Sequence, residues 1–552
     1  MPVISFKYDD LIQLIGNEVP LQKILDELPM MGADFHSYDE GTGEIMMEFF
    51  PNRPDLYCVE GIARALRSFL GFAPGIRQYP IRASDIVMKH DKSTKDVRPF
   101  FVGGVVRNVT MSDELIRSLM GLQEKLHLTI GRKRAKVSIG IHDLDRVEPP
   151  FTYKAVRPDE ISFVPLGKNE AMNLQEILER HEKGIEYRYI LEGKEKYPII
   201  VDRRGEVLSF PPIINGQLTV VTEKTRNILI DVTGTDFHAI SGALNIVATA
   251  MAERGAEIET IVIENEEGSI VTPDLNPKRM SLGVEECEKL LGLNLDVNVI
   301  VRCLERMGYG CEIRDDSIEV FVPATRMDIL HTVDLIEDVA IGYGYESFGR
   351  ILPRCQTIGG EIPLEKAAAL LRDMMVGHGY LEVTTLTLSS PEEQFIRMRI
   401  EPIDFVEILN PISQDHSCLR THLLPSLLAL LKKSKHRDLP QRIFEIGDVV
   451  IGTKRRKHIA AISLHAKAGF TEMKSLVESI MRDCSADFKL EPSSFGMYID
   501  GRQAAVVNSE GVVGHFGEVH PEVLENFTLG YPAAAMEFNV ERLLAGKIER
   551  VV

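Results

Sequence analysis

The spacing of apolar residues changes character several times along the chain, and this constrains the fold more than any other feature of the sequence. Helical spacing of three and four residues alternates with short strand-like runs, and a proline- and acid-rich stretch, residues 264–279, interrupts the pattern near the middle. The sequence has no repeat of the kind that builds solenoids. A chain of 552 residues with this mixture predicts a multidomain α+β protein of about three to five domains with separate cores.

Turn residues and changes of periodicity divide the chain into four segments. We name them the N-terminal, α+β, helical and C-terminal segments, and they cover residues 1–80, 81–270, 271–353 and 354–552. The helical segment predicts the order helix, helix, hairpin, helix. The C-terminal segment opens with a helix from Pro363 and continues with long strands, which predicts a mostly antiparallel sheet with helices packed on it. In the N-terminal segment, Asp55 is placed to cap a helix that ends at Gly71.

The charge balance and the apolar runs narrow the possible partners. The chain has 63 Lys and Arg against 82 Asp and Glu, a formal net charge of −19, so DNA binding over a broad surface is not expected. The best apolar run, nine residues from Leu423, is far shorter than the ~20 residues that cross a membrane. Seven scattered cysteines without a Cys-x-x-Cys pair suit a reducing compartment. We therefore expect a cytoplasmic protein with no membrane partner.

Four carboxylates gather around the start of the last helix of the helical segment. Asp328 lies just before this helix, and the other three occupy positions i, i+3 and i+4 on one helical face: Asp334, Glu337 and Asp338. Mg²⁺ binds oxygen ligands, often one or two carboxylates and several waters, so one interpretation is a magnesium site. The alternative is structural, with Asp334 capping the helix, Glu337 at position N3 of a capping box, and Arg326 relieving the crowded charge.

A second polar cluster lies at strand ends in the α+β segment, within VLSFPPIING and ILIDVTGTDFH. Its candidate site residues are Ser209, Asp231 and Thr233, because loops on a rigid sheet often carry binding sites. The alternative is that the prolines and glycine shape a turn while the polar side chains satisfy backbone donors. No Ser-His-Asp or Cys-His order is visible, so no nucleophile is assigned, and His142 and His238 have no predicted role.

Three stretches resemble the β subunit of phenylalanyl-tRNA synthetase, and the similarity runs in order over nearly the whole chain. They are FPNRPDLYCVEGIARALRSFLG, VFVPATRMDILHTVDLIEDVAIGYGY and LNPISQDHSCLRTHLLPSLLALL. For the fold, this resemblance implies an N-terminal module and then an editing-like, tRNA-binding domain of the B3/B4 type in the α+β segment. It further implies a small winged-helix-like domain of the B5 type in the helical segment and a degenerate class II synthetase-like core in the C-terminal segment.

The same resemblance implies partners and cofactors. In that family the β subunit pairs with an α subunit in an α2β2 heterotetramer, and the α subunit binds the ATP and phenylalanine used in the reaction. Mg²⁺ is expected at the α/β contact, with the four acids of the cluster as matching ligands; Asp338 is the shorter acid at its position. The α+β segment is expected to hydrolyse tyrosine wrongly attached to tRNA(Phe), with the three polar candidates above in its pocket.

The C-terminal segment lacks the residues that adenylate chemistry needs. Its tail reads AAAMEFNVERLL without the glycines that let backbone approach a nucleotide, so Glu541 and Arg542 are expected on a helix surface. Phe444 and Glu445 stand where an Arg-Glu pair of the class II core is expected. We therefore expect this segment to act as a scaffold, and the chain to contribute no catalytic residue to aminoacylation.

These observations predict the β subunit of phenylalanine-tRNA ligase of the archaeal or eukaryotic type. It would support ATP-dependent attachment of phenylalanine to its tRNA and hydrolyse mischarged tyrosyl-tRNA. Three basic runs, residues 131–136, 432–437 and 454–458, offer phosphate contacts at most, because no aromatic residues are interleaved with them. One alternative is a free-standing aminoacyl-tRNA deacylase, which would not need the synthetase-like core. The other is a nucleic-acid-binding adaptor built on the helical segment, which the acidic cluster disfavours.

Overall fold

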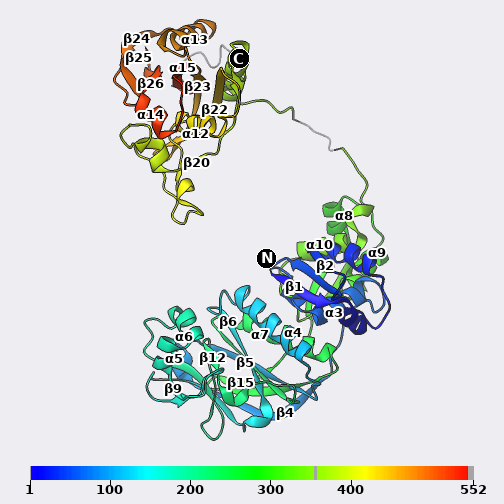
Figure 1. Ribbon diagram of the computed structural model, residues 1–552. Coiled ribbons are helices and arrows are strands. Elements are labelled where there is room, and N and C mark those ends of the chain that lie inside the picture. The colour runs from blue at the N-terminus through cyan, green and yellow to red at the C-terminus, as the bar shows by residue number, and fades with distance from the viewer. Residues whose placement is uncertain (1, 353–356, 545–552) are drawn as a thin grey trace. The chain divides into compact units, whose positions relative to one another are not determined.

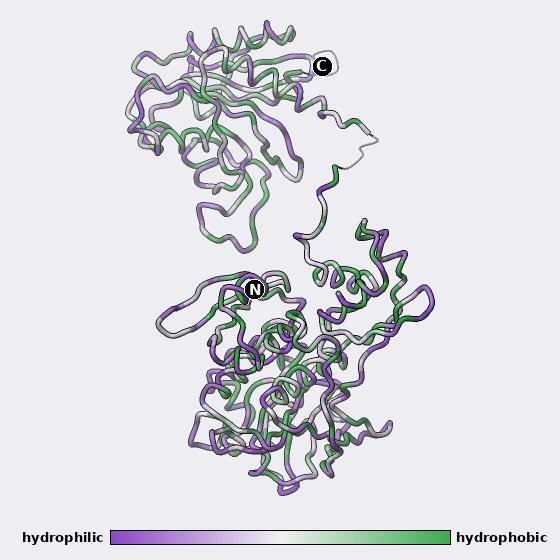
Figure 2. The backbone as a smooth tube through the Cα atoms, turned by 90° about the vertical axis from the view of Figure 1, so that its right-hand side faces the viewer, coloured by the Kyte–Doolittle hydropathy of each residue, from purple (hydrophilic) through white to green (hydrophobic). Residues whose placement is uncertain are grey.

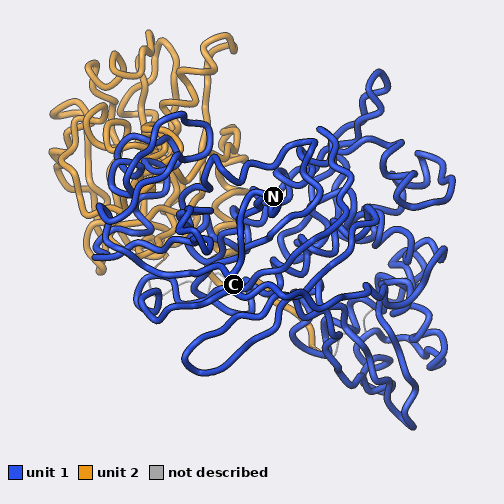
Figure 3. The backbone as a smooth tube through the Cα atoms, turned by 90° about the horizontal axis from the view of Figure 1, so that it is seen from below, with its two compact units in different colours: residues 1–351 blue, residues 352–552 orange. Residues whose placement is uncertain are grey.

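The computed structural model describes residues 2–352 and 357–544, and the chain divides into two compact units. Unit 1 comprises residues 1–351 and unit 2 comprises residues 352–552 (Figures 1 and 3). The expected boundary between residues 353 and 354, and Cys355 beside it, lie outside the described residues. Mixed helices and strands in both units confirm the multidomain α+β class. Within the described ranges, no helix combines the length and the hydropathy that crossing a membrane requires.

The N-terminal segment is a three-stranded antiparallel sheet in the order β1-β3-β2 with helices against it. Its elements are β1 Val3–Lys7, α1 Tyr8–Ile15, α2 Leu21–Glu27, β2 Ala33–Asp39, β3 Glu44–Phe49 and α3 Val59–Phe69. Asp55 does not cap α3, contrary to expectation, because the short turn η2 (Pro54–Leu56) intervenes and Cys58 holds the cap position. Arg53 Nε instead donates to Asp55 Oδ1 at 2.9 Å, so this carboxylate serves a buried ion pair.

The α+β segment is built on a ten-stranded mixed sheet. The helices α4 and α7 pack on one face of this sheet (Figure 1). The main path runs β12-β11-β10-β7-β4-β14-β5-β13-β6, and β15 pairs with β14. Its helices are α4 Asp113–Leu128, α5 Leu174–Arg180, α6 Glu182–Tyr187 and α7 Phe237–Glu253. Its strands are β4 Ile81–His90, β5 Phe100–Arg107, β6 Val137–Asp143, β7 Phe151–Val156, β8 Ser162–Phe163, β9 Met172–Asn173, β10 Tyr197–Val201, β11 Val207–Phe210, β12 Ile214–Asn215, β13 Ile228–Gly234, β14 Glu257–Asn265 and β15 Gly268–Thr272.

The helical segment follows the predicted order with one addition. Its elements are β16 Lys278–Gly283, α8 Val284–Leu291, α9 Val297–Arg306, β17 Gly310–Arg314, β18 Ser317–Val322 and α10 Thr332–Tyr343. The hairpin turns at Asp315, whose φ of 45° is left-handed. The added element is β16, which the sequence pattern did not predict. It pairs antiparallel with β18 and turns the hairpin into a three-stranded sheet.

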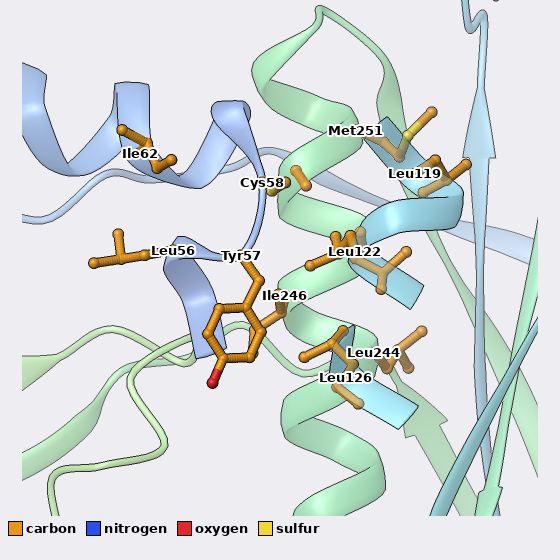
Figure 4. Close-up of a cluster of buried hydrophobic side chains, with 14 of the residues drawn as sticks. Leu56, Tyr57, Cys58, Ile62, Leu119, Leu122, Leu126, Leu244, Ile246 and Met251 are labelled. Carbon is orange, nitrogen blue, oxygen red and sulfur yellow. The ribbon is translucent and has the colours of Figure 1, made fainter. Parts of the chain in front are cut away.

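One continuous hydrophobic core joins the first three segments, so the expectation of separate cores is wrong for them. Figure 4 shows where they meet: Tyr57 and Cys58 of the N-terminal segment lie toward α4 and α7, whose side chains there include Leu122 and Ile246. The helix α7 is apolar on most sides because it packs on the sheet on one side and contacts α3 on another. Each large side chain buried in this way contributes about 1.5 to 3 kcal/mol to folding.

Unit 2 contains a seven-stranded sheet in the order β19-β22-β23-β27-β26-β25-β24. All neighbours are antiparallel except β19 and β22, which confirms the prediction for the C-terminal segment. Its helices are α11 Pro363–Gly377, α12 Leu424–Lys433, α13 Phe470–Asp483, α14 Pro521–Asn526 and α15 Val540–Leu543. Its strands are β19 Leu381–Glu382, β20 Leu388–Ser389, β21 Cys418–Leu419, β22 Gln441–Ile451, β23 Lys454–Leu464, β24 Lys489–Pro492, β25 Tyr498–Asn508, β26 Gly511–Val519 and β27 Ala533–Asn539.

This sheet is covered on both faces. Along β23, Ile459 and Ala461 belong to the core that includes α11 and α13, whereas Ala460 and Ile462 belong to the core that includes α12. Successive side chains of a strand point to opposite faces, so the two cores lie on opposite sides of the sheet. Residues 458–464 of β23 are accordingly all buried, without alternation. Figure 2 shows hydrophobic and hydrophilic stretches mixed along the chain in both units.

Candidate functional site

The polar candidates of the α+β segment surround a cavity of about 270 Å³. Its walls come from α4, β6, the end of β11 with the turn that follows it, and the middle of β13. Ser209 and Asp231 line this cavity, so the two stretches that the sequence analysis singled out face a common space. Thr233 is not among the cavity's lining residues.

Asp231 forms a buried pair with His142. The Asp231 Oδ2 and His142 Nε2 atoms lie 2.5 Å apart, and both side chains are at most 3% exposed. The other ring nitrogen, Nδ1, lies 2.8 Å from the Thr219 hydroxyl oxygen. One ring nitrogen thus contacts the carboxylate and the other contacts Thr219, which fixes the ring and one carboxylate oxygen.

Gly140 makes room for this pair. It lies directly opposite Asp231 in the β6–β13 register, and residues opposite each other in an antiparallel ladder share one face of the sheet. A Cβ at Gly140 would lie 2.1 Å from Asp231 Oδ2 and 2.8 Å from His142 Nε2. The missing side chain at this position therefore leaves room for the pair, of which Asp231 lines the cavity.

Ser209 brings an unsatisfied hydroxyl to the same cavity. Its side chain is buried, and its Oγ has no hydrogen-bond partner in the structure. A buried hydroxyl without a partner costs about 1 to 3 kcal/mol, which a ligand that hydrogen-bonds to it would recover. The cavity thus presents a carboxylate and an unpaired hydroxyl among mostly apolar walls.

Thr233 has a different role from the one expected of a pocket residue. Its hydroxyl accepts a hydrogen bond from Arg98 Nε at 2.8 Å, and its carbonyl accepts one from Arg98 Nη2 at 2.7 Å. Arg98 is almost fully buried, and this desolvation lowers the pKa of its guanidinium to about 10, against the nearby charge of Asp231. Thr233 therefore anchors a buried arginine beside the site.

One basic run lies beside the cavity. Arg134, from the run 131–136, lines the cavity, donates to Glu124 Oε1 at 2.6 Å and stacks on the Tyr187 ring. The hydrogen bond from His127, together with Arg134, lowers the pKa of Glu124 to about 2 against the effect of burial. Two neighbouring basic residues, Arg132 and Lys133, are exposed. Positive charge thus borders the cavity on a chain that is acidic overall.

The acidic cluster of the helical segment is organised around Arg326. Its Nη2 donates to Asp328 Oδ2 and to Asp338 Oδ2, each at 2.7 Å, and the Tyr309 hydroxyl also donates to Asp338. Arg326, Asp328 and Asp338 are all largely buried. Two of the four predicted metal ligands are therefore paired with one guanidinium, as the structural alternative anticipated for Arg326.

The other two acids lie elsewhere on α10. Asp334 Oδ2 accepts hydrogen bonds from the backbone N–H groups of Leu330 and His331, both at 2.8 Å. The helix begins at Thr332, so His331 is the N-cap and Asp334 occupies N3 of the capping box. Glu337 is exposed. In residues 2–352 and 357–544, no three His, Cys, Asp or Glu side chains are placed to hold a metal ion together.

In the C-terminal segment, the charged residues at the positions of the expected class II synthetase motifs make structural contacts. Glu445 forms a buried ion pair with Arg420, at 2.8 Å between Oε1 and Nη1. On the short helix α15, Glu541 pairs with Arg456 at 3.1 Å, and Arg542 Nη1 donates to the Val512 carbonyl at 2.9 Å. Each of these charged groups is thus bound to another part of unit 2.

Comparisons with known proteins cover nearly the whole chain. The family models that match are described as the B3/4 domain over residues 102–262, the tRNA synthetase B5 domain over 280–345, and the phenylalanyl tRNA synthetase beta chain CLM domain over 350–540. The phenylalanine–tRNA ligase beta subunit of Methanothrix thermoacetophila is 46% identical over 98% of this chain and 100% of that protein. The corresponding subunit of Archaeoglobus fulgidus is 44% identical over 98% of each.

A solved structure agrees with these matches. It is an N-terminal fragment of the phenylalanyl-tRNA synthetase beta subunit from Pyrococcus horikoshii, 38% identical, with a TM-score of 0.61 over 62% of this chain and 100% of that one. The fold and these matches place the chain among the tRNA synthetase proteins. It belongs to the family of phenylalanine–tRNA ligase beta subunits, which confirms the resemblance seen in the sequence.

Sequence reasoning left three residues of the cavity region without a role. His142 was noted but not assigned, and neither Arg98 nor Gly140 was singled out. One local signal for this region is the pattern SIGIHD, which places a glycine and a histidine two residues apart on a buried strand. A glycine inside a strand often marks a place where another group approaches closely. Nothing local marks Arg98, because its partners are far away in the sequence.

Proposed function

We propose that this chain is the β subunit of a cytoplasmic phenylalanine–tRNA ligase that assembles with an α subunit as an α2β2 heterotetramer and binds tRNA(Phe). The identity and coverage of the archaeal relatives support the assignment. In this complex the α subunit binds ATP and phenylalanine and carries out aminoacylation. The β chain contributes scaffold surfaces from unit 2, whose Glu445 and Arg542 are committed to contacts within that unit.

The chain alone should not activate phenylalanine. The AAAMEFNVERLL tail offers no glycine cradle for a nucleotide, and Glu445 is bound to Arg420 rather than open to a ligand. We expect no phenylalanine-dependent exchange between ATP and pyrophosphate with the purified β chain, and full exchange once the α subunit is added. Exchange by the β chain alone, at a rate comparable to that of the complex, would refute the scaffold assignment.

We further propose that the cavity at Ser209 and Asp231 hydrolyses tyrosine from mischarged tRNA(Phe). The observation that carries this proposal is the buried Asp231 carboxylate, held by His142, which lines the same cavity as Ser209 with its unpaired hydroxyl. A cavity of about 270 Å³ falls just below the range of drug-sized ligands, which suits a ligand the size of one amino acid.

In this proposal, hydrogen bonds to the tyrosine hydroxyl give the cavity its selectivity for tyrosine over phenylalanine. A phenyl pocket in the aminoacylation site rejects a substrate with one added hydroxyl by only about 10²-fold, so a second site is needed. In our proposal the tyrosine hydroxyl donates to Asp231 and accepts from Ser209. Phenylalanine has no hydroxyl and would leave both groups unpaired, and sites of this kind reject such analogues by roughly 10⁴- to 10⁵-fold.

The ester bond itself needs only a positioned water, because aminoacyl esters are activated. No nucleophile from the chain is required, and none is assigned. Arg132 and Lys133, exposed near the cavity, provide phosphate contacts for the acceptor end of the tRNA. The assay that tests the proposal follows release of tyrosine from preformed tyrosyl-tRNA(Phe) by the α/β complex; absence of release by the wild type would refute it.

For magnesium, we propose a site at the α/β contact that uses Asp334 and Glu337 from this chain. The pairing of Asp328 and Asp338 with Arg326 leaves these two acids on the more accessible side of α10. One or two carboxylates with waters are a common protein contribution to Mg²⁺ binding. Bound there, the ion would neutralise charge at the subunit contact.

Replacing both Asp334 and Glu337 by alanine tests this proposal. We expect α/β association to weaken and to lose its dependence on Mg²⁺, while the free β chain loses only the capping contribution, about 1 kcal/mol. Sedimentation of the complex across a magnesium titration measures the first effect, and urea unfolding of the β chain measures the second. Unchanged assembly with an unchanged magnesium response would assign both acids to structural roles only.

A further inference from the structure

A second cavity, of about 320 Å³, lies within unit 1 and is lined by five arginines. Its walls come from α3 and the residues on either side of it, from Thr249 of α7, and from the segment that leads to α10. The arginines are Arg53, Arg64, Arg67, Arg77 and Arg326. Asp55 is the single acidic residue among the lining residues. This cavity is distinct from the one that holds Ser209 and Asp231.

Three of the guanidinium groups act on Asp55. Arg53 binds it directly, and Arg64 Nη2 lies 3.6 Å from Asp55 Oδ2. Burial would raise the pKa of Asp55, but the charge and hydrogen bond of Arg53, with the charges of Arg64 and Arg326, hold this pKa at about 2. One carboxylate therefore faces three cations in a desolvated setting.

The remaining partners of the arginines leave an excess of positive charge. Arg67 and Arg77 share Glu253, with Arg77 Nε at 3.7 Å from Oε1, and Arg326 pairs with the two acids described above. Five arginines thus meet four acids, Asp55, Glu253, Asp328 and Asp338, which leaves one positive charge uncompensated among these groups.

Arg326 also has a nitrogen without a partner. Its Nη1 is buried and makes no hydrogen bond in the structure, whereas Nε and Nη2 bind Asp328 and Asp338. An unpaired donor on a buried cation is costly, and oxyanions match the planar fork of a guanidinium. At the exposed side of the cavity, the Arg77 side chain is 56% exposed. It makes a long ion-pair contact to Glu253 and lies over the Tyr79 ring, 6.0 Å from the ring centroid.

We propose that this cavity binds a small phosphate-class oxyanion, inorganic phosphate or pyrophosphate, between Arg326 and Arg77. The anion satisfies Arg326 Nη1, balances the excess charge and draws Arg77 inward. Because the lining residues come from the N-terminal, α+β and helical segments, the occupant also ties these three segments together. This site is independent of tyrosine hydrolysis and of the acids proposed for magnesium.

The test is a titration of the full chain with pyrophosphate, in phosphate-free buffer with EDTA and with sodium chloride matching the ionic strength. We expect saturable heat of binding and a rise in the unfolding temperature of the wild type. Arg77→Gln should weaken binding at least tenfold, because one charge-assisted hydrogen bond is lost. The matched control is Arg82→Gln: Arg82 is 69% exposed, pairs with Glu257 and does not line the cavity, so binding should stay within twofold.

A second measurement needs no variant. Pyrophosphate should slow the modification of Arg77 by phenylglyoxal, read by mass spectrometry, and leave the modification of Arg82 unchanged. Equal effects of chloride and pyrophosphate on the unfolding temperature would overturn the proposal. So would equal binding by the two variants, or equal protection of the two arginines.

Discussion

Replacing Asp231 by alanine will slow the release of tyrosine from preformed tyrosyl-tRNA(Phe) by roughly 10- to 150-fold, the effect of losing a hydrogen bond to a charged group. The carboxylate is buried, held by His142 Nε2 at 2.5 Å, and faces the cavity that the Ser209 hydroxyl also lines. Phenylalanine charging by the α/β complex should remain nearly intact, because the cavity belongs to the α+β segment of this chain. Single-turnover deacylation, with charging measured in parallel, checks both expectations.

Two further variants separate recognition from general damage to the fold. Thr233→Ala should have a smaller effect, because Thr233 holds Arg98 and does not line the cavity. Asp202→Asn is the matched control: Asp202 is also buried and accepts hydrogen bonds from the Glu148, Arg204 and Glu206 N–H groups, away from the cavity. Deacylation that is equally fast in the wild type and the Asp231 variant would show that the pocket is formed by other residues.

The largest loss of stability is expected from Arg326→Met. Methionine keeps an unbranched apolar stem but leaves the buried carboxylates of Asp328 and Asp338 without their cation. Removing one partner of a buried ion pair costs about 3 to 5 kcal/mol, because the remaining charge stays desolvated. Urea unfolding followed by circular dichroism measures the change, and hydrogen exchange in peptides of α10 assigns the transition to unit 1.

Arg279→Met is the control for this variant. Arg279 is 73% exposed and lies 3.8 Å from Glu319, so its ion pair should contribute less than about 1 kcal/mol. A loss of stability no larger for the Arg326 variant than for this control would contradict the assignment of Arg326 as the group that organises the acidic cluster. The comparison distinguishes a buried pair from an exposed one within the same segment.

The helices and the strand alternation were predictable because their signals are local. The i, i+3, i+4 spacing places Asp334, Glu337 and Asp338 on α10 wherever the helix sits in the fold. Spacing does not say which of these acids is buried. Asp338 meets Arg326 and Tyr309 because the turn between α9 and β17, which carries Tyr309, and the segment before α10 lie against that face. Glu337 is exposed to solvent.

The candidate site was only partly predictable for the same reason. Asp231 and Thr233, two residues apart on β13, share one face of the sheet by the period of a strand. Their different roles depend on partners far away in the sequence: His142 is 89 residues from Asp231, and Arg98 is 135 residues from Thr233. The register of β6 against β13 then places Gly140 opposite Asp231 and opens the space for the pair.

The sequence by itself determined the class of fold, the division of the chain into segments and the kinds of side chain available in each. Periodicity, capping residues and turn chemistry act over a few residues, so they can be read locally. Only the tertiary structure decided that three segments share one core, that Arg326 takes up two of the four acids, and that five arginines surround one cavity. Burial and charge pairing arise between residues that are distant in the chain, because they depend on which surfaces come together when the chain folds.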